Sequence, residues 1–172
     1  QLLEDHFHIH LVFSGDSLSF NGSSGMEISG SDTNIITACE LYYSESSTLV
    51  LTRASNNTVS DNRVGSSAHN GILLKILSGG NRLIGNVIYS NDRSGIVLSS
   101  SPNNIVANNL AISNARSAVQ ISSSDSNMIV QNEFRGGDSG VWISGTSQNN
   151  VISKNNILSP VLNFIHNTSG QP

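Results

Sequence analysis

The chain has 172 residues, of which 37% are hydrophobic and 12% charged, and its formal net charge is −4 at pH 7. This length fits a single domain, residues 1–172. With only 8 Lys and Arg residues there is no basic stripe for a nucleic acid, and no run of 18 or more apolar residues could span a membrane.

The N-terminal segment, residues 1–10, alternates apolar and polar residues, and we expect it to form an N-terminal strand or cap. His6, His8 and His10 would share one side of that strand, where two histidines at positions i and i+2 can hold a metal ion. Three histidines spaced about 7 Å apart suit no single coordination sphere, however. We therefore expect an exposed polar face, no metal site and no cofactor.

Residues 11–157 repeat one pattern seven times, at a spacing of 23 or 24 residues. The copies begin at Leu11, Asn34, Asn57, Asn81, Asn104, Asn127 and Asn150. Self-similarity at such a period marks a solenoid, in which each repeat buries its apolar face only by stacking on its neighbours. Each repeat would form one rung.

Four positions of the repeat hold apolar residues in copy after copy. The third holds Phe13, Ile36, Val59, Leu83, Val106, Ile129 and Ile152, and the eighth holds Leu18, Leu41, Val64, Ile88, Ala111, Phe134 and Ile157. A later pair is two residues apart, as in Ile96 and Leu98, which is the period of a strand. The sequence therefore predicts an all-β fold, a single-stranded right-handed parallel β-helix of about seven rungs.

The sixth position of the repeat forms a polar column: Asp16, Cys39, Asn62, Asn86, Asn109, Asn132 and Asn155. Stacked asparagines can hydrogen-bond from rung to rung and satisfy bent backbone that would otherwise be buried unpaired. We expect this asparagine ladder to support the fold and not to bind a ligand. Cys39, the only cysteine, is expected to be a small buried residue.

The run Asn104–Asn109, followed by Ser117-Ala118-Val119-Gln120-Ile121, resembles the parallel β-helix repeat of the pectin-lyase-like superfamily. It is most similar to the NosD-type repeats of carbohydrate-associated proteins and sugar hydrolases. The resemblance covers roughly residues 11–160. It implies the fold, and it implies that any chemistry would lie on the outer surface, along one strand face and its flanking turns.

The turn before the later strand pair carries charge on successive rungs, at Glu45, His69, Asp92 with Arg93, Arg116 and Asp138. Enzymes of the superfamily that act on acidic polysaccharides need a cation, a base and an acid. Arg93 and Arg116 could bind a uronate carboxylate. His69 or Asp92 could take the proton beside it, with Asp138 orienting a partner. The alternative is that these turns are charged because they face water.

The outward positions between the paired core residues are Glu27, Val50, Leu73, Val97, Gln120 and Trp142. Four of the six are apolar, and a contiguous apolar stripe is typical of a docking surface. Trp142 could also stack on a sugar ring, with His166 near the same column. We expect an interface with another subunit, or a carbohydrate-binding face, made of Val50, Leu73, Val97, Trp142 and His166.

The C-terminal segment, residues 158–172, is unusually apolar and is expected to be a cap or an assembly segment, because an open solenoid end offers unpaired backbone. Head-to-tail contact between residues 1–13 and 158–172 would give an oligomer or a filament. Three N-glycosylation sequons begin at Asn21, Asn56 and Asn167, although a chain so rich in Asn and Ser produces such sequons by chance.

Abundant Ser, Asn and Gly, and a start at Gln1 without Met, suggest an extracellular, cell-surface or virion-surface protein. The sequence-based interpretation is a non-catalytic module that associates with itself, attaches to a polysaccharide, or does both. The alternative is a polysaccharide-active lyase, epimerase or hydrolase, or the scaffold fragment of one. The apolar outward face favours the first interpretation, because an enzyme would carry charge there.

Overall fold

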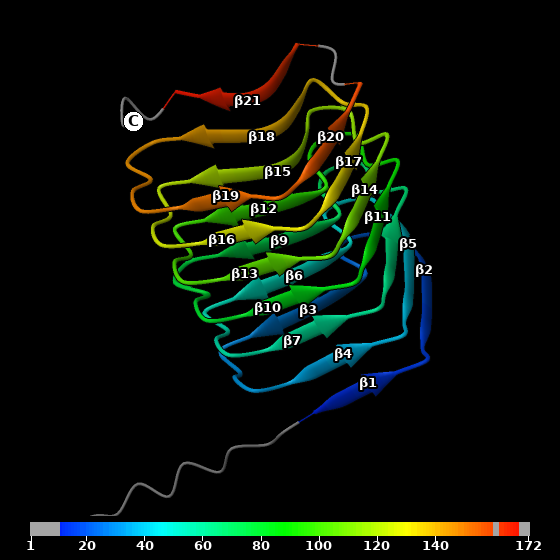
Figure 1. Cartoon of the computed structure of the whole chain (residues 1–172). Coiled ribbons are helices and arrows are strands. Elements are labelled where there is room, and N and C mark those ends of the chain that lie inside the picture. Colours follow the sequence, from blue (N-terminus) through cyan, green and yellow to red (C-terminus); the bar gives the residue numbers. More distant parts are fainter. Residues whose placement is uncertain (1–10, 160–161, 169–172) are drawn as a thin grey trace, which may run out of the picture.

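The computed structural model describes residues 11–159 and 162–168, which form 21 strands and, within those ranges, no helix. The strands pair in parallel into three sheets of seven strands each. Each rung gives one strand to each sheet, and the rungs stack from β1 at one end of the rod to β21 at the other (Figure 1). The predicted all-β solenoid of about seven rungs is confirmed. None of the described residues belongs to a helix that could cross a membrane.

We name the sheets A, B and C in the order in which each rung visits them, and we number the rungs 1–7 from β1–β3 to β19–β21. Sheet A contains β1 (Val12–Ser14), β4 (Ile35–Thr37), β7 (Thr58–Ser60), β10 (Arg82–Ile84), β13 (Ile105–Ala107), β16 (Met128–Val130) and β19 (Val151–Ser153). Sheet B contains β2 (Ser17–Asn21), β5 (Glu40–Ser44), β8 (Arg63–Gly65), β11 (Val87–Tyr89), β14 (Leu110–Ile112), β17 (Glu133–Arg135) and β20 (Asn156–Leu158). Sheet C contains β3 (Met26–Ser29), β6 (Leu49–Thr52), β9 (Ile72–Lys75), β12 (Ile96–Ser99), β15 (Ser117–Ser122), β18 (Ser139–Ser144) and β21 (Asn163–Asn167).

The strand register places the apolar columns inside the rod. Leu83 pairs with Val59 on one side and Val106 on the other, and Ile88 pairs with Val64 and Ala111 in the same way. The side chains in these columns are almost completely buried on the middle rungs, and they pack into one continuous core. A period of two residues therefore sends one side of each strand inward and the other outward.

Asn109 shows how the ladder of the sixth position bonds. Its Nδ2 donates to Asn132 Oδ1 at 3.0 Å on the next rung and to the Leu83 carbonyl oxygen at 2.9 Å on the previous one. Its Oδ1 accepts from the backbone N–H of Asn86 at 2.9 Å and from Asn86 Nδ2 at 3.0 Å. The Asn109 amide thus satisfies two backbone groups of the previous rung and joins them to the asparagine of the next rung. The ladder runs without a break through Asn62, Asn86, Asn109, Asn132 and Asn155.

Two other corners carry polar columns that the sequence analysis missed. The first residues of the repeats form a second ladder, in which backbone N–H and Nδ2 donate to Oδ1 on the next rung; it contains Asn34, Asn57, Asn81, Asn104, Asn127 and Asn150. At the corner between sheets B and C, Ser67 Oγ donates to Asn91 Oδ1 at 2.8 Å, and Asn91 Nδ2 donates to Asn114 Oδ1 at 2.7 Å. The Asn34 column had served only to mark where each repeat begins.

The corners also use left-handed backbone. One column at the corner between sheets B and C has positive φ on all seven rungs, at Phe20, Tyr43, Ser66, Ser90, Ser113, Gly136 and Ser159. Because bulky residues avoid this conformation, the two aromatic members are unusual. The rung-to-rung hydrogen bonds impose the conformation whichever residue occupies the position.

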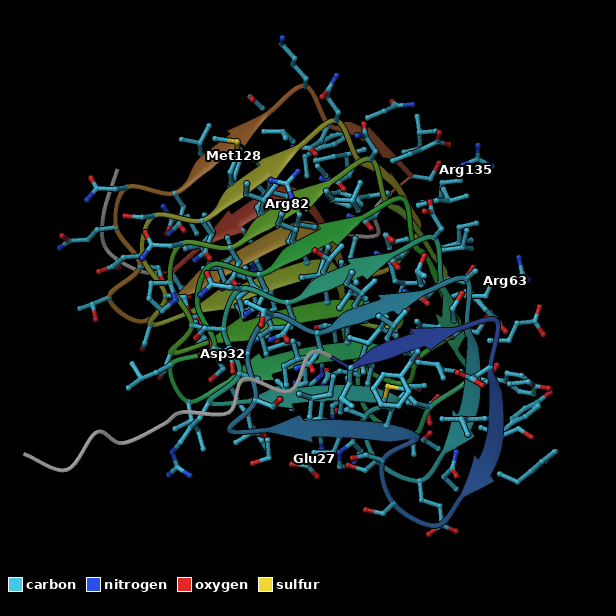
Figure 2. All side chains as sticks on the ribbon, turned by 90° about the horizontal axis from the view of Figure 1, so that it is seen from below. Glu27, Asp32, Arg63, Arg82, Met128 and Arg135 are labelled. Atoms are coloured by element: carbon cyan, nitrogen blue, oxygen red, sulfur yellow. The ribbon has the colours of Figure 1, made fainter. Side chains whose placement is uncertain are left out.

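Charged side chains project outward from the sheets (Figure 2). Arg82 leaves sheet A, while Arg63 and Arg135 leave sheet B. The two ion pairs of the described residues both lie on sheet B: Arg63 contacts Glu40 at 3.8 Å, and Arg135 contacts Glu133. Exposed pairs of this kind contribute little to stability.

The two ends of the rod differ in how much the structure describes. β21 pairs in parallel with β18, so residues 163–167 extend sheet C and do not fold across the end. Phe164 and Ile165 remain exposed. The predicted N-terminal strand, with His6, His8 and His10, lies outside the described residues, and the association of the two ends stays a prediction.

Replacing Asn109 with Ala is expected to lower the free energy of unfolding by about 1–3 kcal/mol, because buried groups of Asn86 and Leu83 lose their partners. Asn156 is exposed on β20 and supplies the matched control. Asn156→Ala should change the free energy of unfolding by less than about 0.5 kcal/mol. Chemical denaturation of both variants and the parent measures the difference. Equal stability of Asn109→Ala and the parent would contradict a structural role for the ladder.

Replacing Ile129, which is completely buried in the third-position column, with Ala should lower the free energy of unfolding by about 2–5 kcal/mol. The loss combines reduced apolar burial with the cavity that remains. The neighbouring Met128 is 42% exposed on the outer face of sheet A, so Met128→Ala should cost much less. Denaturation curves in which the two variants lose the same stability would mean that the inward and outward positions are assigned incorrectly.

Candidate functional site

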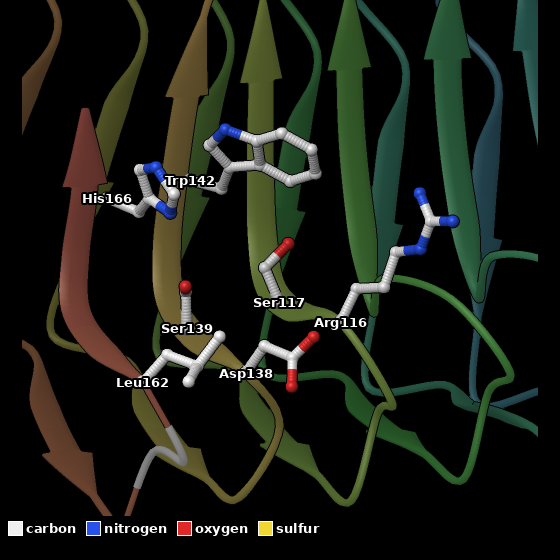
Figure 3. Close-up of a pocket in the computed structure, with 7 residues that line it drawn as sticks. All are labelled: Arg116, Ser117, Asp138, Ser139, Trp142, Leu162 and His166. Carbon is white, nitrogen blue, oxygen red and sulfur yellow. The ribbon is translucent and has the colours of Figure 1, made fainter. Parts of the chain in front are cut away.

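A hollow of about 260 Å³ opens on the outer face of sheet C at rungs 5–7 (Figure 3). We call it the C-terminal hollow, and it is lined by Arg116, Ser117, Asp138, Ser139, Trp142, Leu162 and His166. Arg116 and Asp138 come from the charged turn column, and Trp142 and His166 come from the outward strand face. The sequence pattern had assigned these residues to separate columns.

Backbone pairing fixes the positions of the lining residues. Arg116, Asp138 and Leu162 directly precede β15, β18 and β21, so they occupy the same place on successive rungs. The Ser139 N–H donates to the Arg116 carbonyl oxygen at 2.9 Å, and the Leu162 N–H donates to the Asp138 carbonyl oxygen at 2.9 Å. With rungs about 4.8 Å apart, the three side chains can contact one ligand.

Trp142 and His166 form the aromatic wall of the C-terminal hollow. They pair in register on β18 and β21, with ring centroids 5.9 Å apart and planes inclined by 31°. The indole Nε1–H donates to Thr168 Oγ1 at 3.4 Å, and Asn163 Nδ2 lies 3.5 Å from His166 Nδ1. An indole face can stack on a sugar ring, and an imidazole can take or give a proton.

Gly140 allows the strands around the hollow to approach closely. A Cβ at this position would lie 2.6 Å from Ile157 Cγ2 and 2.7 Å from the Phe164 carbonyl oxygen. Any larger residue would push β18 away from β21 or from the core. The separation of Trp142 and His166 therefore depends on a glycine that the sequence analysis did not single out.

Arg116 and Asp138 are both exposed, and neither takes part in the two ion pairs of the described residues. The guanidinium is therefore available to an anionic ligand. The Asp138 carboxylate is available to hydroxyl groups or to a proton. Together with His166, the hollow offers a cation, a carboxylate and an imidazole on one face.

The remaining members of the turn column lie outside this hollow. Glu45 and Asp92 line a second hollow at rungs 2–4, while His69 and Arg93 line neither. Backbone hydrogen bonds do stack the turns, since the Arg93 N–H donates to the His69 carbonyl oxygen at 2.9 Å. His69 nevertheless lies two rungs from Arg116. The charged turn column therefore does not form one cluster, because stacked turns bring side chains of neighbouring rungs together but not side chains that lie several rungs apart.

The predicted apolar stripe is not continuous. Val50 is 3% exposed and Val97 is 7% exposed, so neither can dock a partner. Long side chains from neighbouring rungs lie across the outer face of sheet C. Thr52 Oγ1 donates to Glu27 Oε1 at 3.3 Å, and Ser94 Oγ donates to Gln120 Oε1 at 3.3 Å. Leu73 is half-buried, and Trp142 with His166 belongs to the C-terminal hollow.

The predicted sequons differ in exposure. Asn56 and Asn167 are exposed, whereas Asn21 is half-buried and its Nδ2 is buried without a hydrogen-bond partner.

Cys39 is 1% exposed, and its backbone N–H donates to Asn62 Oδ1 at 2.9 Å, at the head of the asparagine ladder. Among the described residues, no three His, Cys, Asp or Glu side chains gather in a metal-binding group.

Residues 8–157 match the family model described as the right-handed β-helix region. The chain belongs to the right-handed β-helix family. No curated protein sequence matches it. The predicted pectin-lyase-like type of parallel β-helix is confirmed by this match and by the solved structures of the same fold. The finer likeness to NosD-type repeats stays a prediction.

The solved structures that share this right-handed β-helix include two epimerases and a tailspike domain. The periplasmic alginate epimerase AlgG has a TM-score of 0.77 and 22% identity over 92% of this chain and 44% of its own. The A-module of the Azotobacter vinelandii mannuronan C-5 epimerase AlgE4 has a TM-score of 0.76 and 14% identity over 94% and 58%. The enzymatically active domain of bacteriophage CBA120 tailspike protein 2 has a TM-score of 0.65 and 14% identity over 91% and 24%. At these identities the likeness establishes the fold alone.

The sequence-based interpretation of a non-catalytic module is corrected here, because the comparisons favour the enzyme alternative. The similar solved structures include epimerases, an enzymatically active tailspike domain, a DFA-IIIase and a glycoside hydrolase. The observation behind that interpretation also fails, because Val50 and Val97 are covered and the outward face at rungs 5–7 is polar and aromatic. The right-handed β-helix described here spans less than half the length of the alginate epimerase.

Proposed function

We propose that this right-handed β-helix belongs to an enzyme that acts on an acidic polysaccharide, with its chemistry in the C-terminal hollow. The observation that carries the proposal is the meeting of Arg116, Asp138, Trp142 and His166 in one hollow on the outer face. The likeness in fold to alginate and mannuronan epimerases supports the same substrate class.

The reaction class follows from the charges in the hollow. Removal of the proton beside a uronate carboxylate places negative charge on that carboxylate, and Arg116 would stabilise it. His166 is the residue best suited to take the proton. In elimination, the same imidazole can pass the abstracted proton to the leaving glycosidic oxygen. This requires that the proton and the leaving oxygen lie on the same face of the sugar ring. Asp138 would accept hydrogen bonds from sugar hydroxyls, and Trp142 would hold the ring.

Hydrolysis fits the hollow less well. Glycoside hydrolysis generally uses two carboxylates that face each other across the scissile bond. The described lining residues include one carboxylate, Asp138. Proton abstraction from a uronate is therefore the favoured reaction class. Of its two outcomes we favour elimination. Epimerisation would also need a proton donor on the opposite face of the sugar ring.

We further propose a setting outside the cytoplasm. A periplasmic epimerase and a phage tailspike are among the proteins of similar fold. Long polysaccharides are encountered in such settings.

The proposal is tested by substitution of the two groups with the sharpest roles. Arg116→Gln and His166→Gln should each lower kcat/KM, and loss of the proton-transferring imidazole should cost roughly 10²–10⁴-fold. The assay measures ultraviolet absorbance of unsaturated uronate released from alginate, pectate and unsulfated chondroitin, with NMR of the products to detect epimerisation. Arg82→Gln, an exposed arginine of sheet A, is the control and should leave kcat/KM unchanged.

All variants should keep the circular dichroism spectrum and melting temperature of the parent, because the three side chains lie outside the core. Full turnover by His166→Gln would remove His166 from the chemistry. The absence of elimination and epimerisation on every uronate-containing polymer tested would contradict the proposed reaction class.

A further inference from the structure

A second hollow, of about 440 Å³, lies at the corner between sheets B and C on rungs 2–4. We call it the tyrosine hollow, and it is lined by Tyr43, Ser44, Glu45, Ser66, Ser67, Ala68, Ser90 and Asp92. Its members come from successive turns of the same corner. The C-terminal hollow lies on the same side of the rod, three rungs further on, which is roughly 14 Å at about 4.8 Å per rung.

One wall of the tyrosine hollow is an exposed aromatic stack. Tyr43 and Phe20 lie with ring centroids 4.8 Å apart and planes inclined by 15°, and they are 50% and 79% exposed. Both have positive φ, at 56°. The same corner position holds Ser66, Ser90 and Ser113 on the following rungs.

The polar lining of the tyrosine hollow is acidic and rich in hydroxyl groups. Glu45 and Asp92 are exposed carboxylates, and none of the described lining residues is a cation. Ser44 is 3% exposed, and its hydroxyl is buried without a hydrogen-bond partner. The corresponding hydroxyl of Ser67, on the next rung, bonds to Asn91 Oδ1 at 2.8 Å. Ser44 thus belongs to the buried polar column of this corner, and the accessible polar groups of the hollow include the Glu45 and Asp92 carboxylates.

The two hollows therefore select different sugars. Arg116 in the C-terminal hollow attracts a carboxylate, whereas Glu45 and Asp92 repel one. Carboxylates accept hydrogen bonds from sugar hydroxyls, and the face of Tyr43 can stack on the apolar face of a sugar ring. This combination suits an uncharged, hydroxyl-rich sugar unit.

We infer that the tyrosine hollow is a second saccharide subsite, which binds an uncharged sugar unit of the same chain whose uronate occupies the C-terminal hollow. The substrate class is then a heteropolysaccharide that contains both uronate and neutral sugars, and not a homopolymer of uronate. This inference rests on the proposed function for the C-terminal hollow, and the subsite can be tested by binding alone.

The test is isothermal titration calorimetry of the unmodified chain and its variants with three hexasaccharides. These are cellohexaose (neutral), an oligomannuronate (all uronate) and an unsulfated chondroitin hexamer, in which uronate and N-acetylhexosamine alternate. We expect the mixed hexamer to bind more tightly than the oligomannuronate. Tyr43→Ser, which installs the residue found at this corner on rungs 3–5, should weaken binding of the mixed hexamer roughly tenfold, or about 1.4 kcal/mol.

The matched control is Leu77→Ser, because Leu77 is also an exposed apolar residue with positive φ, 71% exposed, and lines neither hollow. It should bind all three hexamers as the unmodified chain does. The double variant Glu45→Gln with Asp92→Asn should gain affinity for the oligomannuronate several-fold, because two repelling charges are removed, and that gain should disappear in high salt.

The inference is overturned if the unmodified chain fails to bind the mixed hexamer, if it binds the oligomannuronate as tightly, or if Tyr43→Ser binds the mixed hexamer as the unmodified chain does. These outcomes are distinct from failure of the proposed function. If turnover is lost in His166→Gln but binding is unchanged in Tyr43→Ser, the subsite alone is rejected. Binding that depends on Tyr43 without turnover of any uronate polymer rejects the catalytic proposal alone.

Discussion

The hydrogen bonds between stacked asparagines are the interaction on which the rest of this structure depends. A rung must bend its backbone at each corner, and buried polar residues line all three corners. An unpaired buried N–H or C=O costs about 1–3 kcal/mol, which a domain of this size cannot bear at every rung. The side-chain amide of Asn109 bonds to backbone groups of Leu83 and Asn86 on the previous rung and to the Asn132 side chain on the next rung. The corners are therefore fixed in register, and the strands between them can only stack in parallel.

Once the corners are fixed, outward side chains fall into columns, and function depends on which residues those columns bring together. Sheet C carries covered or polar residues along most of its length and gathers a cation, a carboxylate, an imidazole and an indole only at rungs 5–7. The corner beside it carries an aromatic stack at rungs 1–2 and carboxylates at rungs 2 and 4. One regular scaffold thus presents two hollows of opposite electrostatic preference along one side. A rod of this kind suits an extended polymer, because a polymer can contact several rungs at once.

The sequence was sufficient for the fold because one period governs it. The column from Phe13 to Ile152 and the asparagine column from Asn62 to Asn155 could be written from spacing alone, and strand pairing follows that register. The ladder of Asn34 was missed because its members looked like markers of repeat boundaries. Positive φ at Tyr43 could not be foreseen either, since the rung-to-rung bonds override the preference of the residue.

The site was harder to predict because it depends on side chains that cross between columns. Val50 was expected to be exposed, but the burial of an outward residue depends on whether a neighbour such as Glu27 reaches across it. Arg116 and His166 belong to different columns and different rungs, and only the start of β21 after Leu162 places them around one hollow. The sequence supplied the residue types, while the pairing of the last two rungs supplied the site.

The most direct measurement of the central claim uses Trp142, the only tryptophan in the chain, as a reporter of the C-terminal hollow. The unmodified protein is titrated with the mixed hexamer while its tryptophan emission is recorded. A sugar ring stacked on the indole predicts a saturable change in emission with the same Kd as calorimetry gives, and a weaker Kd in Arg116→Gln. Calorimetric binding that saturates while the emission of Trp142 stays constant would place the saccharide elsewhere and contradict the account.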